Sequence, residues 1–178
     1  DIGENRIQEA ESKWKALQNA CLTWHLIGHL QKNKVAKAVC IFDWVHSVDS
    51  LALLEQLEKA ASAQKKPLKV LLQVKLVPDD TKFGLSKEQL FALLPHLNFL
   101  QWVSVRGLMT IAPFGSDPST LKDIFGGLRI LASEIANLNY AKVQMEHLSM
   151  GMSEDYEIAI QEGATMIRLG HKIFGSRS

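Results

Sequence analysis

The sequence carries almost no excess charge and has no long apolar run, and these two absences exclude two classes of partner. Its 178 residues include 20 Lys and Arg against 19 Asp and Glu, for a net charge of +1. No basic cluster stands out that would recruit nucleic acid or an anionic membrane over long range. The longest apolar runs, such as Val70–Leu72, are far shorter than the roughly 20 residues of a membrane-spanning helix. We therefore expect no nucleic acid and no membrane among its partners.

Cysteine and metal-ligand patterns are also scarce. Cys21 and Cys40 lack CxxC or zinc spacing and stand in apolar surroundings, where buried reduced thiols are commoner than disulfides or metal ligands. His25 and His29 are four residues apart, but His25 belongs to an apolar stretch typical of a strand that Gly28 ends, so the helical metal spacing does not apply. We expect no metal site and a cytoplasmic protein.

What the sequence does have is a regular alternation of two patterns. Short apolar stretches rich in β-branched and aromatic residues alternate with segments of helical periodicity. The predicted strands are 23–28, 44–48, 68–77, 104–111, 144–149 and 166–170, with 1–3 as the end of an earlier strand. The predicted helices are 6–18, 31–39, 50–63, 86–97, 120–138 and 153–162. Strands separated by helices pair in parallel, because a parallel crossover needs a dozen or more residues.

Two parallel architectures satisfy this order, a doubly wound sheet and a closed barrel. Six strands and a stub, in units of roughly 30 residues, match an eight-stranded barrel from which about one unit is missing. The doubly wound alternative is weaker, since no GxGxxG follows an early strand. The chain opens on Asp1, without a signal-peptide pattern, and its start looks like a cut. We predict an α/β fold, a (β/α)8 barrel that lacks its first strand and part of the first helices, with residues 1–178 as one domain.

The predicted helices show where they begin and which face they bury. Ser50 and Ser86 stand where helix N-caps belong. The helix after Ser50 has leucines at amphipathic spacing, so one face should pack on the sheet. On its other face, Glu55, Glu58 and Lys59 are expected to face water.

The functional residues of a barrel lie at the carboxyl ends of its strands, where the loops that follow them meet. Alternation along 166–170 places Met166, Arg168 and Gly170 on one face. Arg168 is a permanent cation in an apolar strand, and such a group needs a partner. That partner is either an acid on a neighbouring strand, in a structural salt bridge, or a ligand.

The stretch 148–153 is a second candidate, a strand that runs into a helix predicted to begin near Ser153. Free amides at a helix N-terminus and a Ser hydroxyl make a phosphate site. A plain helix cap is the alternative, because Ser is a favoured N-cap and Glu154 and Asp155 already complement the helix dipole. Together with Arg168, this stretch suggests a ligand with a phosphate at one end and an acceptor nitrogen at the other.

Several motifs in the same order resemble the YggS/PROSC family of pyridoxal 5′-phosphate (PLP) homeostasis proteins, and within it the cyanobacterial type. The motifs are Gly3–Glu9, Trp24–Lys34, His46–Ser50, Arg106–Thr110 and Leu148–Gly175. They span nearly the whole chain. The resemblance implies a single barrel of the alanine racemase type that binds PLP.

The resemblance also implies roles for particular residues. Ser153 and the amides of Gly170 and His171 would hold the phosphate, and Arg168 would face the pyridine nitrogen. Asn5 would line the pocket, and Ser149 is a further candidate. The family often has Thr in place of His171, so only the backbone contact is carried over there.

The lysine that forms a Schiff base with PLP in the family ends the first strand, upstream of Asp1, so this sequence does not contain it. Lys34 and Lys82 match other lysines of the family and are not assigned that role.

Arg168 bears on what a bound PLP could do. Arginine only donates hydrogen bonds, so the ring nitrogen would stay unprotonated and the ring would be a poor electron sink. The resemblance implies a non-catalytic protein of vitamin B6 and amino-acid homeostasis, which buffers PLP or delivers it to recipient PLP enzymes. We expect a monomer at full length.

Two alternatives stay open, an amino-acid racemase and a protein-interaction module built on the barrel. A two-base racemase needs a further base, usually a Tyr from a second domain. Only Tyr140 and Tyr156 are present here.

Overall fold

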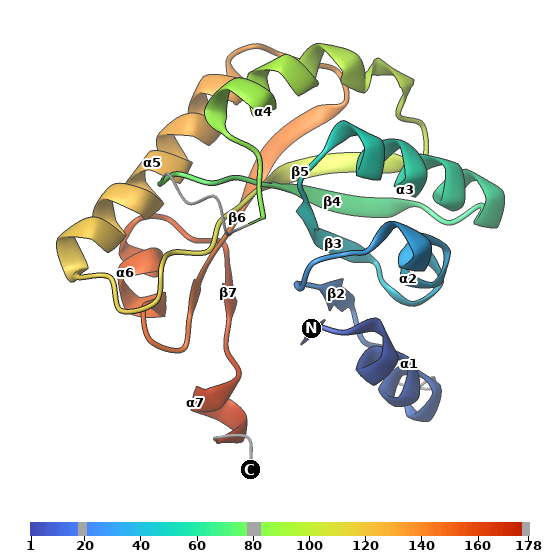
Figure 1. Ribbon diagram of the computed structural model, residues 1–178, viewed down its shortest axis with the longest axis horizontal. Helices are drawn as coiled ribbons and strands as arrows, with labels where there is room; N and C mark the ends of the chain where they lie inside the picture. Colours follow the sequence, from blue (N-terminus) through green and yellow to red (C-terminus); the bar gives the residue numbers. More distant parts are fainter. Residues whose placement is uncertain (18–20, 78–82, 176–178) are drawn as a thin grey trace.

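In the part of the chain that the structure describes, the sheet contains seven strands, all parallel and hydrogen-bonded in chain order (Figure 1). The computed structural model describes residues 1–17, 21–77 and 83–175. The strands are β1 (Ile2–Glu4), β2 (Trp24–Leu26), β3 (Trp44–Val48), β4 (Leu68–Gln73), β5 (Val103–Met109), β6 (Val143–Met152) and β7 (Met166–Arg168). They curl into a nearly closed barrel with β1 and β7 as its two edges. The predicted parallel barrel is confirmed, and Ile2 and Gly3 belong to a strand, which continues to Glu4.

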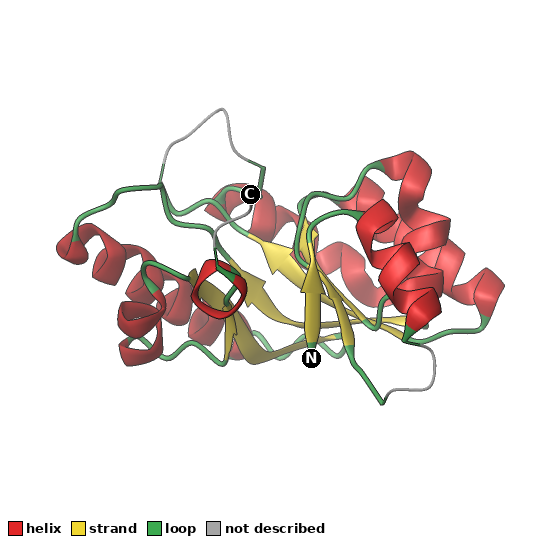
Figure 2. Ribbon diagram, turned by 90° about the horizontal axis from the view of Figure 1, so that it is seen from below, coloured by secondary structure: helices red, strands yellow, loops and turns green. Residues whose placement is uncertain are grey.

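Helices connect the strands and lie outside the barrel, on both sides of the strands in Figure 2. The α-helices are α1 (Ile7–Ala16), α2 (Val35–Ile41), α3 (Leu51–Gln64), α4 (Lys87–Leu93), α5 (Pro118–Ala136), α6 (Tyr156–Gln161) and α7 (His171–Phe174). Two 3₁₀ turns, η1 (Lys32–Lys34) and η2 (Leu94–Phe99), adjoin α2 and α4. No helix in the part of the chain that the structure describes is long and apolar enough to cross a membrane.

Local side-chain chemistry sets several helix starts. The Ser50 hydroxyl accepts a hydrogen bond from the amide of Leu53, and Ser86 forms a reciprocal capping box with Gln89. Both predicted N-caps are therefore confirmed. Asp117 caps α5 in the same way, ahead of a proline in the first turn.

The two faces of the sheet bury different sets of residues. Val45, Val70 and Leu108 belong to the large core that the helices cover. Their neighbours Trp44, Leu71 and Met109 form a separate cluster with Met166. Because successive residues of a strand point to opposite faces, this second cluster lies inside the barrel. The interior is thus a small packed core of its own.

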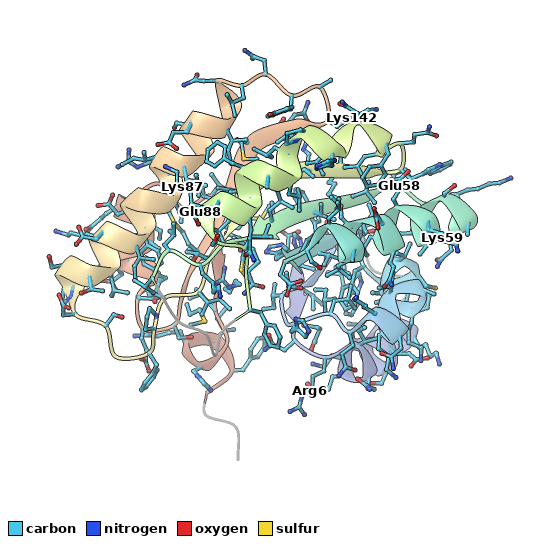
Figure 3. All side chains as sticks on the ribbon, turned by 45° about the horizontal axis from the view of Figure 1, so that its top comes forward. Arg6, Glu58, Lys59, Lys87, Glu88 and Lys142 are labelled. Atoms are coloured by element: carbon cyan, nitrogen blue, oxygen red, sulfur yellow. The ribbon has the colours of Figure 1, made fainter. Side chains whose placement is uncertain are left out.

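Two predictions about exposure are wrong. Glu58, labelled on α3 in Figure 3, does not face water but is half-buried. Its carboxylate accepts hydrogen bonds at 2.8–3.1 Å from the amides of Gln101, Trp102 and Val103, where β5 begins. Glu55 and Lys59 are exposed as predicted. Cys21 and Cys40 are free thiols, but both are exposed. Cys40 stands between two buried residues on α2, and the helical turn points it away from the core.

The end of β6 also differs from the prediction. The strand continues to Met152, which pairs with Arg168 of β7. The Asp155 carboxylate accepts a hydrogen bond from the Met152 amide at 2.5 Å, and α6 begins only at Tyr156. Ser153 therefore lies in a turn and is not a helix N-cap. The helix therefore begins three residues later than predicted. The pairing of β6 with β7 and the contact of Asp155 with Met152 account for this difference.

Candidate functional site

Arg168 is the last residue of β7 and the positively charged group of the candidate site. Its Nη1 donates to Ser149 Oγ at 2.7 Å, and its Nη2 donates to the carbonyl oxygen of Thr110 at 2.9 Å. Burial lowers the pKa of Arg168 to about 10, against an opposing contribution from Asp155, so the guanidinium stays charged at neutral pH. The residues with described placement include no carboxylate within ion-pair distance of it. The structural salt bridge considered for Arg168 is therefore not found there.

Beneath the guanidinium lies a line of buried polar side chains. Ser149 Oγ is 2.9 Å from Nδ1 of His46, and Nε2 of His46 is 2.9 Å from Nδ1 of His25. Burial lowers the pKa of His46 to about 3, and the neighbouring His25 and Arg168 lower it further because each disfavours a second positive charge beside it. Burial likewise lowers the pKa of His25 to about 4. Both imidazoles are neutral at neutral pH.

Ser153 and Gly170 meet beside Arg168, from the turns that follow β6 and β7. The amide of Gly170 donates to Ser153 Oγ in a long hydrogen bond of 3.4 Å. A Cβ on Gly170 would meet no atom within 4 Å, so the space beside this amide is open. His171 follows directly at the start of α7 and is exposed.

Asn5 lies at the other edge of the barrel, just after β1, and is exposed. A Cβ on Gly28 would stand 2.2 Å from the Asn5 carbonyl oxygen, so only glycine permits this close approach of the β1 and β2 ends. The structure thus groups Ser149, Ser153, Arg168, Gly170 and His171 on β6, β7 and the segments that follow them. It places Asn5 after β1, the opposite edge strand.

Sequence reasoning counted His46 and Thr110 among the positions at the carboxyl ends of the strands but gave neither a role in this site. Alternation within 44–48 places Trp44 and His46 on the same face, which was the available signal for a polar residue inside the barrel. Thr110 contributes its backbone carbonyl oxygen, which accepts from Arg168. Every residue has such a carbonyl, so the residue type could not indicate this contact. In the described ranges no group of three or more His, Cys, Asp or Glu residues could hold a metal ion.

Comparison with known proteins defines the class first. The family model of the alanine racemase N-terminal domain matches residues 1–178. The alanine racemase of Clostridium difficile superposes with a TM-score of 0.75 at 14% identity over 98% of this chain and 44% of its own, which shows a shared fold.

Closer relatives narrow the class. The chain is 46% identical over 178 residues to the pyridoxal phosphate homeostasis protein of Synechocystis sp., covering 99% of this chain and 81% of that protein. The protein of the same name from Aquifex aeolicus is 41% identical over 175 residues, 98% of this chain and 76% of the relative. PipY of Synechococcus elongatus, solved without PLP, superposes with a TM-score of 0.93 at 47% identity over 97% of this chain and 80% of its own. The chain belongs to the pyridoxal phosphate homeostasis proteins of the alanine racemase N-terminal domain family. The predicted resemblance is confirmed.

Proposed function

We propose that this chain binds PLP at the carboxyl ends of β6 and β7 and acts in PLP and amino-acid homeostasis without catalysing a reaction of its own. The observation that carries the proposal is Arg168, a charged guanidinium bonded only to neutral oxygens among the described residues, beside the open space at Gly170. PipY, 46% identical to this chain, has also been solved with PLP bound.

The residues present fit the two ends of this ligand. Phosphate and pyridine nitrogen both accept hydrogen bonds, and the site offers donors. The Ser153 hydroxyl and the amides of Gly170 and His171 would hold the phosphate, and Arg168 would donate to the ring nitrogen. Asn5 would line the pocket from β1. Ser149, fully buried under Arg168, would contribute through the guanidinium.

PLP, when bound, supplies an aldehyde and a conjugated ring that can accept electrons. Arg168 limits that second capacity, because a guanidinium keeps its proton and leaves the ring nitrogen unprotonated. Neither tyrosine is a good base for a racemase. Tyr140 precedes β6, at the opposite end of the barrel. The Tyr156 hydroxyl donates to Glu157, which raises the pKa of Tyr156.

We further propose that residues 1–178 form one PLP-binding domain of a cytoplasmic protein, monomeric at full length, which passes PLP to recipient enzymes. The unpaired thiols of Cys21 and Cys40 fit a reducing compartment. The Schiff-base lysine of the family would be supplied from residues upstream of Asp1.

The first experiment compares the 178-residue chain with the protein translated from the whole reading frame. Each is mixed with PLP, and its visible absorbance is recorded before and after borohydride. A chromophore that borohydride fixes only in the longer protein supports the assignment of the lysine. Turnover of an amino acid by the pure longer protein would contradict a non-catalytic role.

The second experiment tests Arg168 itself. Arg168→Ala should weaken PLP binding about 10- to 100-fold, the cost of a lost charge-assisted hydrogen bond. Arg129→Ala is the control, because Arg129 lies on the exposed side of α5 and bonds to Glu162. Equal affinities of the Arg168→Ala variant and the wild type would refute the proposal.

A further inference from the structure

Three buried polar side chains connect Arg168 to the opposite wall of the barrel. Ser149, His46 and His25 are 0%, 2% and 7% exposed. Ser149 is on β6, while His46 and His25 are on β3 and β2. The line therefore crosses the barrel interior instead of following one strand. Burying polar groups is costly, and Nε2 of His25 has no hydrogen-bond partner among the described residues, so this line needs a reason beyond filling space.

The Arg168 donor favours one direction for the hydrogen bonds along the line. Arg168 has no acceptor, so Nη1 donates to Ser149 Oγ. The Ser149 proton then points to the other neighbour of that oxygen, Nδ1 of His46, because the described residues offer the hydroxyl no further acceptor. His46 is neutral with Nδ1 unprotonated, so its proton is on Nε2 and is donated to Nδ1 of His25. The Arg168 donor thus favours a proton on Nε2 of His46 and a bare Nδ1 on each imidazole of the line.

Aromatic packing holds the two imidazoles in place. The His25 ring stacks on Trp44 with centroids 5.6 Å apart and planes 9° apart. The His46 ring meets His25 edge-on, with centroids 5.1 Å and planes 76° apart, and lies at 67° to Trp44. With both rings fixed, Nδ1 of His46 is a stationary acceptor for the Ser149 hydroxyl. The hydroxyl oxygen then presents its lone pairs to Arg168 in one orientation.

We propose that His46 is a positioning residue of the PLP site: through Ser149 it fixes the orientation of the Arg168 guanidinium, and His25 fixes the tautomer of His46. The proposal rests on the proposed function for the ligand that Arg168 meets. Two of the five N–H groups of Arg168 are used in the bonds to Ser149 and Thr110. Holding these two sets the direction of the remaining N–H groups. Preorganisation of this kind strengthens ligand binding, because the guanidinium loses no freedom when the ligand arrives.

The test uses three variants of the full-length protein and two measurements. His46→Phe keeps a ring but removes the acceptor, Ser149→Ala removes the link, and His46→Asn keeps an acceptor oxygen near the position of Nδ1. The first measurement is NMR of the PLP-free protein with labelled histidine and arginine. The second is PLP affinity, measured in a double-mutant cycle with Arg168→Ala. Circular dichroism checks that each variant is folded.

In the PLP-free wild type, we expect His46 with a bare Nδ1 and a protonated Nε2, and slow rotation of the Arg168 guanidinium. His46→Phe and Ser149→Ala should each speed that rotation and weaken PLP binding about tenfold. His46→Asn should stay within about threefold of the wild type. In the Arg168→Ala background, His46→Phe should cause no further loss.

Three results would overturn the inference: a protonated Nδ1 on His46, unchanged guanidinium rotation in His46→Phe, or the same loss of affinity with and without Arg168. The last would mean that His46 acts only on the stability of the barrel. Failure of the proposed function would look different, because Arg168→Ala alone would then leave PLP affinity unchanged. Even then, NMR of the PLP-free protein still tests whether His46 orients the Arg168 guanidinium, because that measurement needs no ligand.

Discussion

Acidification should destabilise this protein well above the pH at which carboxylates are protonated, because His46 is buried neutral. The pKa of His46 falls from 6.5 to about 3 on folding, chiefly through burial. Below pH 6.5 His46 is protonated in the unfolded chain but stays neutral in the folded chain. The stabilisation is therefore complete above the unfolded pKa and is lost as pH falls toward the folded pKa.

The size of the effect follows from linkage. Each pH unit in the window costs about 1.4 kcal/mol for one histidine. Between pH 7 and pH 5, His46 should cost about 2 kcal/mol of the free energy of unfolding. His25, whose pKa falls to about 4, should cost a similar amount. Together they amount to a large part of the stability of an ordinary domain.

Urea denaturation at half-unit steps from pH 7.5 to pH 5 measures this slope. His46→Phe should roughly halve it. A second variant, His25→Phe combined with His46→Phe, should remove most of it and leave the contribution of His147, whose pKa burial also lowers. His96→Asn is the matched control, since His96 is exposed on η2. A wild-type stability that does not change over this range, or a His46→Phe variant with the full wild-type slope, would show that the reasoning is wrong.

Three further variants test single contacts. Glu58→Gln should lower the free energy of unfolding by about 1–3 kcal/mol in denaturant titrations, because the charged acceptor of the Gln101, Trp102 and Val103 amides is lost. Glu55→Gln, on the exposed side of the same helix, should change it by less than about 0.5 kcal/mol. Gly107→Ala should fail to give soluble folded protein, since its Cβ would stand 1.9 Å from the His147 carbonyl oxygen; a native circular dichroism spectrum would contradict this. Gly170→Ala should fold like the wild type but bind PLP about tenfold more weakly in titrations, because the methyl group enters the open space beside the amide; undiminished binding would place the phosphate elsewhere.

Much of the fold could be predicted because its signals are local. Helix caps such as Ser50 and Ser86 act on amides three residues away, so neighbouring residues suffice to recognise them. Predicted and observed elements differ mostly at their ends. Where the prediction of Ser153 as a helix cap was wrong, the deciding contact was the pairing of Met152 with Arg168 on another strand.

Part of the candidate site could also be predicted. Period-two alternation identified Arg168 as a cation on a strand face with Gly170, and the resemblance to a family assigned the remaining residues. Whether Asn5, Ser153, Gly170 and His171 contact PLP stays a prediction until binding is measured. Local sequence could not indicate that Ser149 is fully buried and bonded to two partners.

The sequence by itself determined the alternation of strands and helices, the parallel pairing and the face on which Arg168 lies, because periodicity and caps depend on residues close along the chain. Only the tertiary structure decided the polar line that ends on Arg168. Ser149 and His46 are 103 residues apart, and their strands β6 and β3 are not neighbours in the sheet. Such a contact exists only when the sheet curls and brings opposite walls within hydrogen-bond distance.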